Sequence, residues 1–301
     1  MAAEGMSSML PVAIVPRVGI GRSTVLSDYW AMTKPEINTL IALTTASSFA
    51  LAAAAGNTSF PWTRLLHTVA GTVLVASGAA ALNQWMERRF DARMRRTARR
   101  PVAAGRIEPV RALAFGALLS LSGVAYLLVA AGMLASLLAT ATLLGYLLLY
   151  TPSKRSTPLC TLIGAIPGAM PPLIGWAAAR GRLDTEAWGL FLIVLLWQFP
   201  HFMAIAWMYR DDYERAGYRV LPQGEAKVRF VVLQTLLPLV GLMLVSLLQG
   251  VGAFLVSFAF LYYGVRFAHG RSGRAARGLL FASIVYLPVL FALGVFARSL
   301  P

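Results

Sequence analysis

Nine apolar segments, each close to the roughly twenty residues that a helix needs to cross a bilayer, constrain this fold more than any other feature. Only 13% of the 301 residues are charged, whereas a soluble domain carries about 25% charged residues. The sequence therefore predicts an all-α, polytopic membrane protein. The expected spans are 36–55, 65–86, 109–131, 133–151, 158–178, 188–208, 230–249, 251–267 and 278–297.

Two of the expected connections between spans are very short. The third and fourth segments meet near Gly132, and the seventh and eighth meet near Gln249-Gly250. Both are interpreted as tight helical hairpins with almost no loop. Because either pair could also be one long segment, a count of eight spans stays open.

The basic residues predict how the spans are oriented. Only four of the 27 lysines and arginines fall on the side opposite the amino terminus, and these are Arg64, Arg180, Arg182 and Arg298. Basic residues accumulate in cytoplasmic loops of membrane proteins. We therefore expect a cytoplasmic amino terminus, a periplasmic carboxyl terminus and a bacterial inner-membrane location.

Composition also excludes several classes of protein. The formal charge of +15 does not indicate nucleic-acid binding, because the charges lie in short loops between apolar segments. The single cysteine, Cys160, excludes an internal disulfide and a cysteine-rich metal site. Residues 1–27 lack a cleavable signal pattern and are expected to form a flexible cytoplasmic tail. Residues 28–301 are expected to form one transmembrane domain surrounded by membrane lipid.

Three oxygen-bearing side chains recur every fourth residue where the second span ends. Asn83, Glu87 and Asp91 would lie along one stripe of a helix, about 12 Å long. Carboxylate and amide oxygens suit a hard cation such as Mg²⁺ bound to phosphate, and the arginines that follow suit phosphate directly. This stretch predicts a site for a lipid diphosphate.

A second acidic pair, Asp211 and Asp212, follows the sixth span on the same predicted membrane face. Carboxylates from two helix ends could hold Mg²⁺ between them, with a diphosphate as the bridging ligand. The alternative is that both are solvated loop acids which balance the basic inner surface. Their placement on the same face as the Asn83 stripe favours the metal site.

His201 lies well inside the sixth span, directly after Pro200. A polar side chain at this depth usually faces a cavity, so His201 could ligate a haem iron or accept a proton. A hydrogen bond between helices is the structural alternative. The fifth span carries Gly164, Gly168 and three prolines, which indicate a broken helix that either lines a cavity or packs closely against a neighbour.

These stretches resemble the UbiA superfamily of intramembrane prenyltransferases, and within it the branch that modifies haem. The first motif corresponds to Asn83 through Asp91 with the basic run that ends at Arg99-Arg100-Pro101. The stretches typical of the haem branch are 164–176 and 197–222, and the opening Asp28-Tyr29 and Thr33-Lys34-Pro35 also match. Gln84 and Glu87 depart from the pattern, since many members carry Asp there. The resemblance covers residues 28–222.

The resemblance implies a nine-helix bundle around a central cavity. It also implies transfer of a farnesyl group from farnesyl diphosphate to a vinyl group of haem b, with Mg²⁺ as cofactor and a haem A synthase as a candidate partner. The expected metal ligands are Asn83, Glu87, Asp91, Asp211 and Asp212, with His201 on the haem side. The expected substrate-binding residues are Arg95, Arg96, Arg99, Arg100, Lys154 and Tyr213.

Three alternatives stay open. A prenyltransferase that acts on an aromatic quinone precursor would share the first motif but not the two stretches typical of the haem branch. A multi-pass transporter would need charges near mid-membrane and paired half-chain repeats, and the sequence favours neither. An inactive assembly scaffold would have no use for the acidic stripe.

Overall fold

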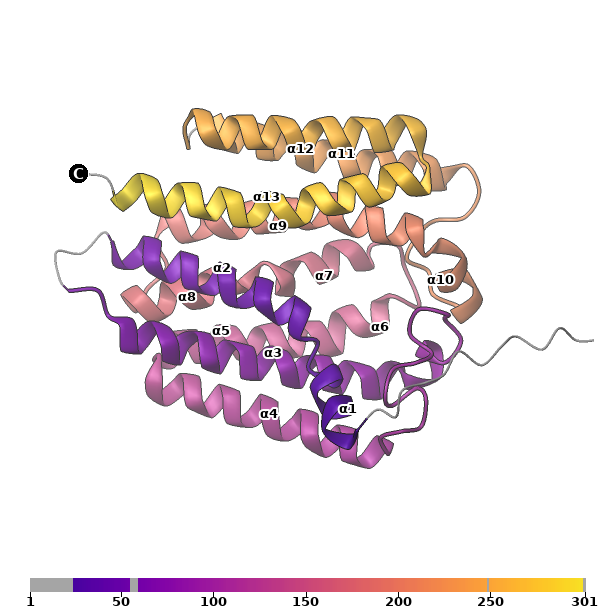
Figure 1. The fold of residues 1–301 in the computed structure, drawn as a ribbon, viewed down its shortest axis with the longest axis horizontal. Helices are drawn as coiled ribbons and strands as arrows, with labels where there is room; N and C mark the ends of the chain where they lie inside the picture. The colour runs from indigo at the N-terminus through magenta and orange to yellow at the C-terminus, as the bar shows by residue number, and fades with distance from the viewer. Residues whose placement is uncertain (1–23, 55–58, 248, 300–301) are drawn as a thin grey trace, which may run out of the picture.

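The structure is a computed structural model, and it describes residues 24–54, 59–247 and 249–299. All regular elements in these ranges are helical, and the long helices lie side by side in a bundle (Figure 1). Eight of the described helical segments are long and apolar enough to cross a membrane. They are α3 (Trp62–Asp91), α4 (Pro109–Ala130), Met133–Ser153, Cys160–Arg180, α9 (Thr185–Met208), α11 (Ala226–Leu247), α12 (Val251–Gly270) and α13 (Gly273–Ser299). The predicted all-helical membrane bundle is confirmed.

The remaining predicted span, 36–55, forms helix α2 (Pro35–Ala53). It is not among the eight because its polar side chains, including Asn38, Thr44 and Ser48, lower its hydropathy. These three side chains are buried, and α2 packs against α3, α13 and α8 (Met170–Arg180). Composition alone therefore supports eight spans in the described part of the chain, with α2 as a further, more polar helix inside the bundle.

Both predicted tight connections separate two helices. Gly132 (φ 103°) links α4 to α5 (Met133–Leu144), and Gly250 (φ 101°) precedes α12. Glycine reaches such positive φ angles without steric cost, which is why the chain can reverse here in so few residues. The two boundaries at which the sequence left eight spans open are thus real helix ends.

The fifth predicted span is broken, as its prolines indicate. It consists of α7 (Cys160–Gly168) and α8, which meet at Ala169. A Cβ atom on Gly164 would collide with the ring of Tyr150, and one on Gly168 with the amide of Gln198. At these glycines the structure therefore shows close helix packing, which was one of the two interpretations left open.

The fourth predicted span changes its helical geometry before it reaches the polar end of the bundle. Helix α5 continues through the π-helical turn η1 (Gly145–Tyr150) into the short α6 (Thr151–Ser153). The Thr151 hydroxyl donates to the carbonyl oxygen of Tyr146 and accepts from the side-chain amide of Asn83. This turn ties the end of the fourth span to α3 and presents Lys154 directly after it.

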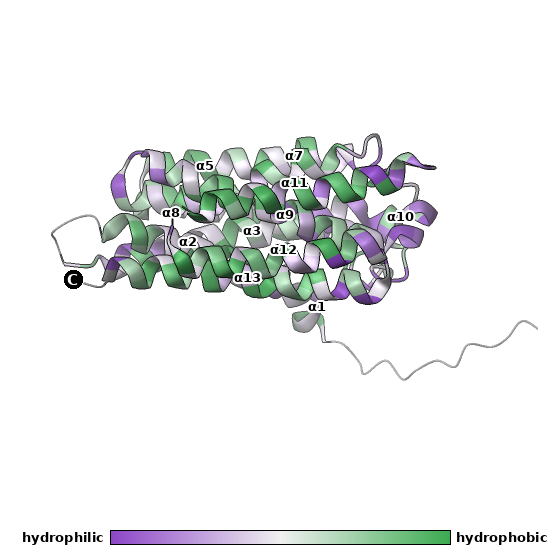
Figure 2. Cartoon of the chain, turned by 90° about the horizontal axis from the view of Figure 1, so that it is seen from above, coloured by the Kyte–Doolittle hydropathy of each residue, from purple (hydrophilic) through white to green (hydrophobic). Residues whose placement is uncertain are grey.

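Hydrophilic residues gather at the two ends of the bundle, and the middle is apolar (Figure 2). One end carries α1 (Val25–Met32), α10 (Arg210–Ala216) and the loop after α3 (Figure 1). Near the opposite end Arg64 donates to Ala131 and Arg298 donates to Leu51, each to a backbone carbonyl. Of the expected tail, residues 1–23 lie outside the described residues, and α1 begins at Val25.

Candidate active site

The acidic stripe forms the last turns of α3. Asn83, Glu87 and Asp91 are 1%, 3% and 1% exposed, although two of them carry charges. Because α3 is continuous through Asp91, the spacing of four places the three side chains on one helix face, as the sequence predicts. Buried carboxylates require hydrogen-bond or ion-pair partners, and these partners make up the rest of the site.

Glu87 joins three segments of the chain. Its carboxylate oxygens accept hydrogen bonds from the ammonium of Lys154 at 2.9 and 3.0 Å and from the Tyr218 hydroxyl at 2.9 Å. Burial acts to lower the pKa of Lys154, but the Glu87 carboxylate holds it above its ordinary value. Burial and the same carboxylate raise the pKa of Tyr218, so the phenol remains a donor.

Asp91 is bound by the loop that follows it. The Arg100 guanidinium donates to both carboxylate oxygens at 2.9 and 2.8 Å, and the Thr97 hydroxyl donates to the Asp91 carbonyl at 3.0 Å. The basic run therefore folds back over the end of α3. Arg100, expected to bind substrate, neutralises Asp91 in this structure.

Asp212 connects the second acidic pair to the first. Its carboxylate accepts from the backbone N–H of Arg96 at 3.2 Å and from the guanidinium of Arg215 at 2.9 Å. Burial acts to raise the pKa of this carboxyl, but the backbone N–H groups of Arg96 and Arg95 and the charge of Arg215 hold it below its ordinary value. The two acidic segments thus lie at the same end of the bundle and contact one another.

Asp211 has a different environment. Its side chain is 76% exposed and pairs with the guanidinium of neighbouring Arg210 at 3.4 Å. On the short helix α10 adjacent residues point in different directions, so only Asp212 is turned towards the loop after α3. The structure brings Asp212 into the cluster and leaves Asp211 at the surface.

The other expected substrate-binding residues divide in the same way. The Arg96 guanidinium donates to the Tyr213 hydroxyl at 3.2 Å and lies over the Tyr209 ring at 4.7 Å. Arg95 and Arg99 have exposed side chains. Arg96 and Tyr213 therefore border the cluster, while Arg95 and Arg99 extend from its rim.

His201 contacts a different helix pair. Its Nδ1 lies 2.8 Å from the hydroxyl of Ser283 on α13, and its ring stacks on Trp197 at 4.8 Å. The Trp197 indole donates to the Ser283 carbonyl at 2.7 Å. Helix α9 continues through Pro200 without a break. The hydrogen bond between helices, the structural alternative for His201, is therefore present.

Two residues of the cluster were not assigned a role from the sequence. Tyr218 lies within the matched stretch 197–222, and Lys34 belongs to the matched Thr33-Lys34-Pro35. Burial and the charges of Arg100 and Lys154 lower the pKa of the half-buried Lys34 to about 7. The signal that could have identified Lys34 is a charge directly before an apolar segment, next to a proline.

No three His, Cys, Asp or Glu side chains within the described ranges lie close enough to form a preassembled metal site. The donor set still fits a hard cation, because Glu87, Asp91 and Asp212 offer carboxylate oxygens and Asn83 offers an amide. Each carboxylate is now paired with a basic side chain. A metal diphosphate carries both kinds of charge: its cation could bind the carboxylates, and its phosphate oxygens could bind the basic side chains that now pair with them.

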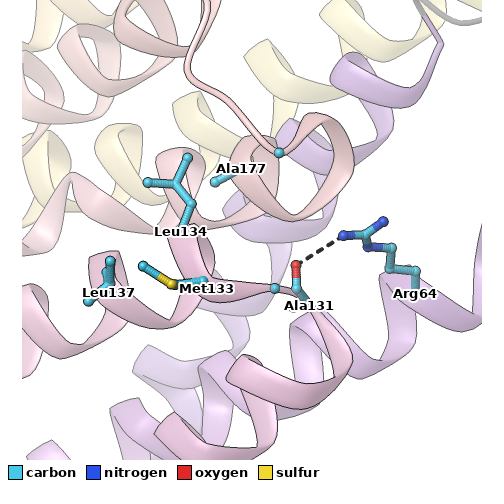
Figure 3. A pocket seen from close by; sticks show the side chains of 8 residues that line it. Arg64, Ala131, Met133, Leu134, Leu137 and Ala177 are labelled. Atoms are coloured by element: carbon cyan, nitrogen blue, oxygen red, sulfur yellow. Dashed lines mark hydrogen bonds between the residues drawn. The ribbon is translucent and has the colours of Figure 1, made fainter.

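A pocket of about 390 Å³ lies near the opposite end of the bundle, between the start of α3 and the α4–α5 turn (Figure 3). Its lining is mostly apolar, and its one charged side chain, Arg64, donates to the Ala131 carbonyl at 3.2 Å. It contains no carboxylate and no hydroxyl. The polar cluster around Glu87 is therefore the better candidate for the reaction centre.

An all-helical membrane bundle with buried carboxylates and basic side chains at one end fits an intramembrane prenyltransferase. The chain belongs to the UbiA prenyltransferase family, whose family model matches residues 41–296. It is 46% identical over 289 residues to a protoheme IX farnesyltransferase of Solibacter usitatus, a match that covers 91% of this chain and 99% of the relative. It is 40% identical over 313 residues to a protoheme IX farnesyltransferase of Koribacter versatilis, covering 98% and 100%.

Solved structures show the same fold at low identity. The structure of a digeranylgeranylglyceryl phosphate synthase matches with a TM-score of 0.70 and 15% identity, covering 91% of this chain and 98% of the other. A UbiA homolog from Archaeoglobus fulgidus, bound to GPP and Mg²⁺, matches with a TM-score of 0.59 and 13% identity, covering 89% and 99%. The predicted family and its multi-pass membrane fold are confirmed.

Proposed function

We propose that this chain transfers the farnesyl group of farnesyl diphosphate to a vinyl group of haem b and so makes haem O. One observation carries the donor half of the proposal. Carboxylates from α3 and α10 meet at one end of an apolar bundle, and each faces a basic side chain. The acceptor half is supported by the relatives, which share the name protoheme IX farnesyltransferase and match almost from end to end.

Mg²⁺ is the cofactor that we propose, with Asn83, Glu87, Asp91 and Asp212 as the residues that would hold it. Their donors are all oxygen, which is the preference of this ion. The ion would supply positive charge to the departing diphosphate. Asp211 is left out of this set because its exposed carboxylate pairs with Arg210.

Lys154 and Arg100 would change partners when substrate binds. In the free protein they neutralise Glu87 and Asp91. In the complex they would turn their charges to the phosphate oxygens, for which ammonium and guanidinium groups are well suited. Arg96, next to Tyr213 and Asp212, would extend this positive surface.

The reaction then needs little covalent chemistry from the protein. The bond between the allylic carbon and its oxygen breaks, and the diphosphate leaves with the electron pair. The vinyl carbon of haem b forms the new carbon–carbon bond to the farnesyl cation. Water adds to the cationic carbon that remains on the haem and loses a proton, which completes the hydroxyethyl group.

His201 is the residue that we propose for the haem side. Ser283 donates its hydroxyl proton to the Leu280 carbonyl at 2.6 Å, so its oxygen accepts from Nδ1–H of His201. The imidazole is thereby fixed with an unprotonated Nε2, the tautomer that ligates a metal. Stacking on Trp197 holds the ring plane.

Charge placement supports the proposed orientation. Arg64 lies at the start of α3, Arg180 and Arg182 at or just after the end of α8, and Arg298 at the end of α13. These helix ends lie opposite α10 and the loop after α3 (Figure 1), so the polar cluster would face the cytoplasm in the bacterial inner membrane. The carboxyl terminus would then be periplasmic. Residues 28–301 would act as one transmembrane domain, and a haem A-forming enzyme is the class of partner that would consume the product.

The proposed function is tested directly by offering the protein two acceptors at once. Purified protein in detergent or liposomes is incubated with farnesyl diphosphate, Mg²⁺ and equal amounts of haem b and 4-hydroxybenzoate. We expect farnesyl on the extracted haem and none on the benzoate, measured by mass spectrometry. Prenylated benzoate with unchanged haem would instead identify an enzyme for an aromatic quinone precursor. Absence of any prenylated product would overturn the proposal.

A further inference from the structure

The residue before α2 has an unusual backbone. Lys34 adopts φ 53° and ψ 64°, in the left-handed region. Only one other non-glycine residue in the described ranges, Arg271, has a positive φ. Residues other than glycine and asparagine rarely adopt this conformation. The proline that follows also restricts the backbone conformations open to Lys34, and it favours extended ones. Strain of this kind persists only where the surroundings impose it, and it is concentrated at functional sites.

Two buried amides bind the backbone directly before Lys34. Gln84 Nε2 donates to the Met32 carbonyl at 3.3 Å, and Asn38 Nδ2 donates to the Thr33 carbonyl at 2.9 Å. The side-chain oxygens of both amides are buried with no hydrogen-bond partner among the described groups. A buried acceptor without a partner is costly. The fold therefore tolerates two such costs in order to hold the turn around Lys34.

The turn brings Lys34 to the polar cluster. Gln84, which holds the Met32 carbonyl, directly follows Asn83 on α3, so the turn packs against the helix turns that carry the acidic stripe. The charges of Arg100, Lys154, Glu87 and Asp91 all contribute to the lowered pKa of Lys34, which agrees with this position. The start of α2 lies towards the end of the bundle that carries α10 and the loop after α3 (Figure 1). Lys34 thus approaches the same groups that we assign to the diphosphate, from a helix that contributes none of the carboxylates.

Lys34 differs from Lys154 and Arg100 in that no carboxylate pairs with it in the described part of the chain. Lys154 pairs with Glu87 and Arg100 pairs with Asp91. Within the described residues, the Lys34 ammonium forms no hydrogen bond and no ion pair; Arg100 and Lys154 repel it, while Glu87 and Asp91 attract it from a longer distance than an ion pair. A multivalent anion placed between these three cations would remove this repulsion, because it attracts all of them at once.

We propose that Lys34 binds the diphosphate group of the prenyl donor, and that Asn38 and Gln84 are positioning residues which hold the turn that presents it. This inference rests on the proposed function for its donor half alone and is independent of the acceptor. The group recognised is the diphosphate itself. Inorganic pyrophosphate with Mg²⁺ therefore serves as a probe for the same contact.

The backbone conformation offers a matched pair of variants. Lys34→Asn removes the ammonium but supplies, after glycine, the residue that best tolerates the left-handed region, so we expect the turn and the fold to be retained. Lys34→Arg keeps the charge at the same backbone position. Both are compared with the wild type as full-length, detergent-solubilised protein, by calorimetric titration with farnesyl diphosphate and with inorganic pyrophosphate, each with Mg²⁺.

We expect Lys34→Asn to weaken binding of both ligands by about tenfold or more, at an unchanged or higher melting temperature. Lys34→Arg should recover most of the affinity. In turnover assays Lys34→Asn should raise KM for the diphosphate donor and leave KM for the acceptor unchanged. Wild-type-like affinity for both ligands in a folded Lys34→Asn variant would overturn the inference.

The positioning role has its own readout. Asn38→Ala should weaken pyrophosphate binding in the wild-type background but not in the Lys34→Asn background, because the turn matters only through the side chain it presents. Equal losses in both backgrounds would show that Asn38 acts independently of Lys34. That result would remove the positioning role.

The binding arm separates this inference from the acceptor proposal. If wild-type protein binds farnesyl diphosphate through Lys34 but leaves haem b unchanged, the haem acceptor is wrong and the inference stands. If it converts haem b while Lys34→Asn binds the donor normally, the inference is wrong and the function stands. If the wild type binds neither probe, both are overturned.

Discussion

The Lys154 ammonium lies 2.9 and 3.0 Å from the two carboxylate oxygens of Glu87, across 67 positions of sequence. The two side chains are 13% and 4% exposed, so the pair is largely withdrawn from water. Tyr218 donates to the same carboxylate. This contact ties the end of α6 and the loop after α10 to the acidic stripe of α3, and it holds together the carboxylate and the ammonium that we propose for a metal diphosphate.

Glu87→Gln should abolish product formation and also destabilise the protein. The substitution leaves the Lys154 ammonium buried without its counter-ion, and breaking a buried pair typically costs about 3–5 kcal/mol. Thermal unfolding in detergent and a turnover assay measure the two effects. The double variant Glu87→Gln with Lys154→Gln should regain part of the stability but none of the activity. Recovery of activity in the double variant would mean that the pair is purely structural.

Asp212→Asn should reduce turnover by about a hundredfold or more, because it removes a buried oxygen ligand, whereas Asp211→Asn should stay near wild type. The two neighbours differ in the structure by burial and by partner. The two substitutions form a matched comparison, because each removes one negative charge at adjacent positions of the same helix. Initial rates at saturating substrate measure the effect. A larger loss at Asp211 would contradict the assignment of Asp212 to the site.

Stability should depend on pH through Lys34. Its pKa of about 7 lies below the ordinary 10.5, so the folded chain holds this proton less tightly than the unfolded chain does. Raising the pH from 7 towards 10.5 should therefore stabilise wild-type protein relative to Lys34→Asn, in the absence of ligand. Melting temperatures of both proteins across this range give the difference. A difference that does not change with pH would contradict the lowered pKa.

Much of the fold follows from the sequence because membrane helices are specified locally. The predicted hairpins at Gly132 and Gly250 are present, since positive φ and a short connection are both encoded by glycine. The break in the fifth span is encoded by its prolines. Helix α2 was predicted as the span 36–55, although its buried polar side chains give it a lower hydropathy than the other spans.

The site was predicted less completely because its partners are distant in sequence. The spacing of Asn83, Glu87 and Asp91 encodes their common face, but nothing local pairs Glu87 with Lys154 or Tyr218. The choice between Asp211 and Asp212 depends on how α10 is rotated, which the pattern of two adjacent acids does not encode. The π-helical turn that presents Lys154 likewise has no sequence signal of its own.

The haem-side assignment predicts a spectroscopic change. His201→Ala should remove an axial imidazole, so ferric haem b bound to the variant should show a shifted Soret band and an altered spin state. Ser283→Ala keeps the imidazole but removes the hydroxyl that holds the proton on Nδ1. Loss of such an orienting partner typically weakens metal binding about 10–100-fold. Haem titrations followed by absorbance separate the two variants. Identical spectra in wild type and His201→Ala would remove His201 from the haem side.

The most direct test of the central claim combines the acidic stripe with the product. Membranes that contain wild-type protein or Asp91→Asn are incubated with haem b, farnesyl diphosphate and Mg²⁺, and the extracted haem is analysed by mass spectrometry. We expect the wild type to yield haem that carries a farnesyl group and a hydroxyl. Asp91→Asn should yield only haem b while the variant remains folded in the membrane. Near-normal conversion by Asp91→Asn would contradict the account.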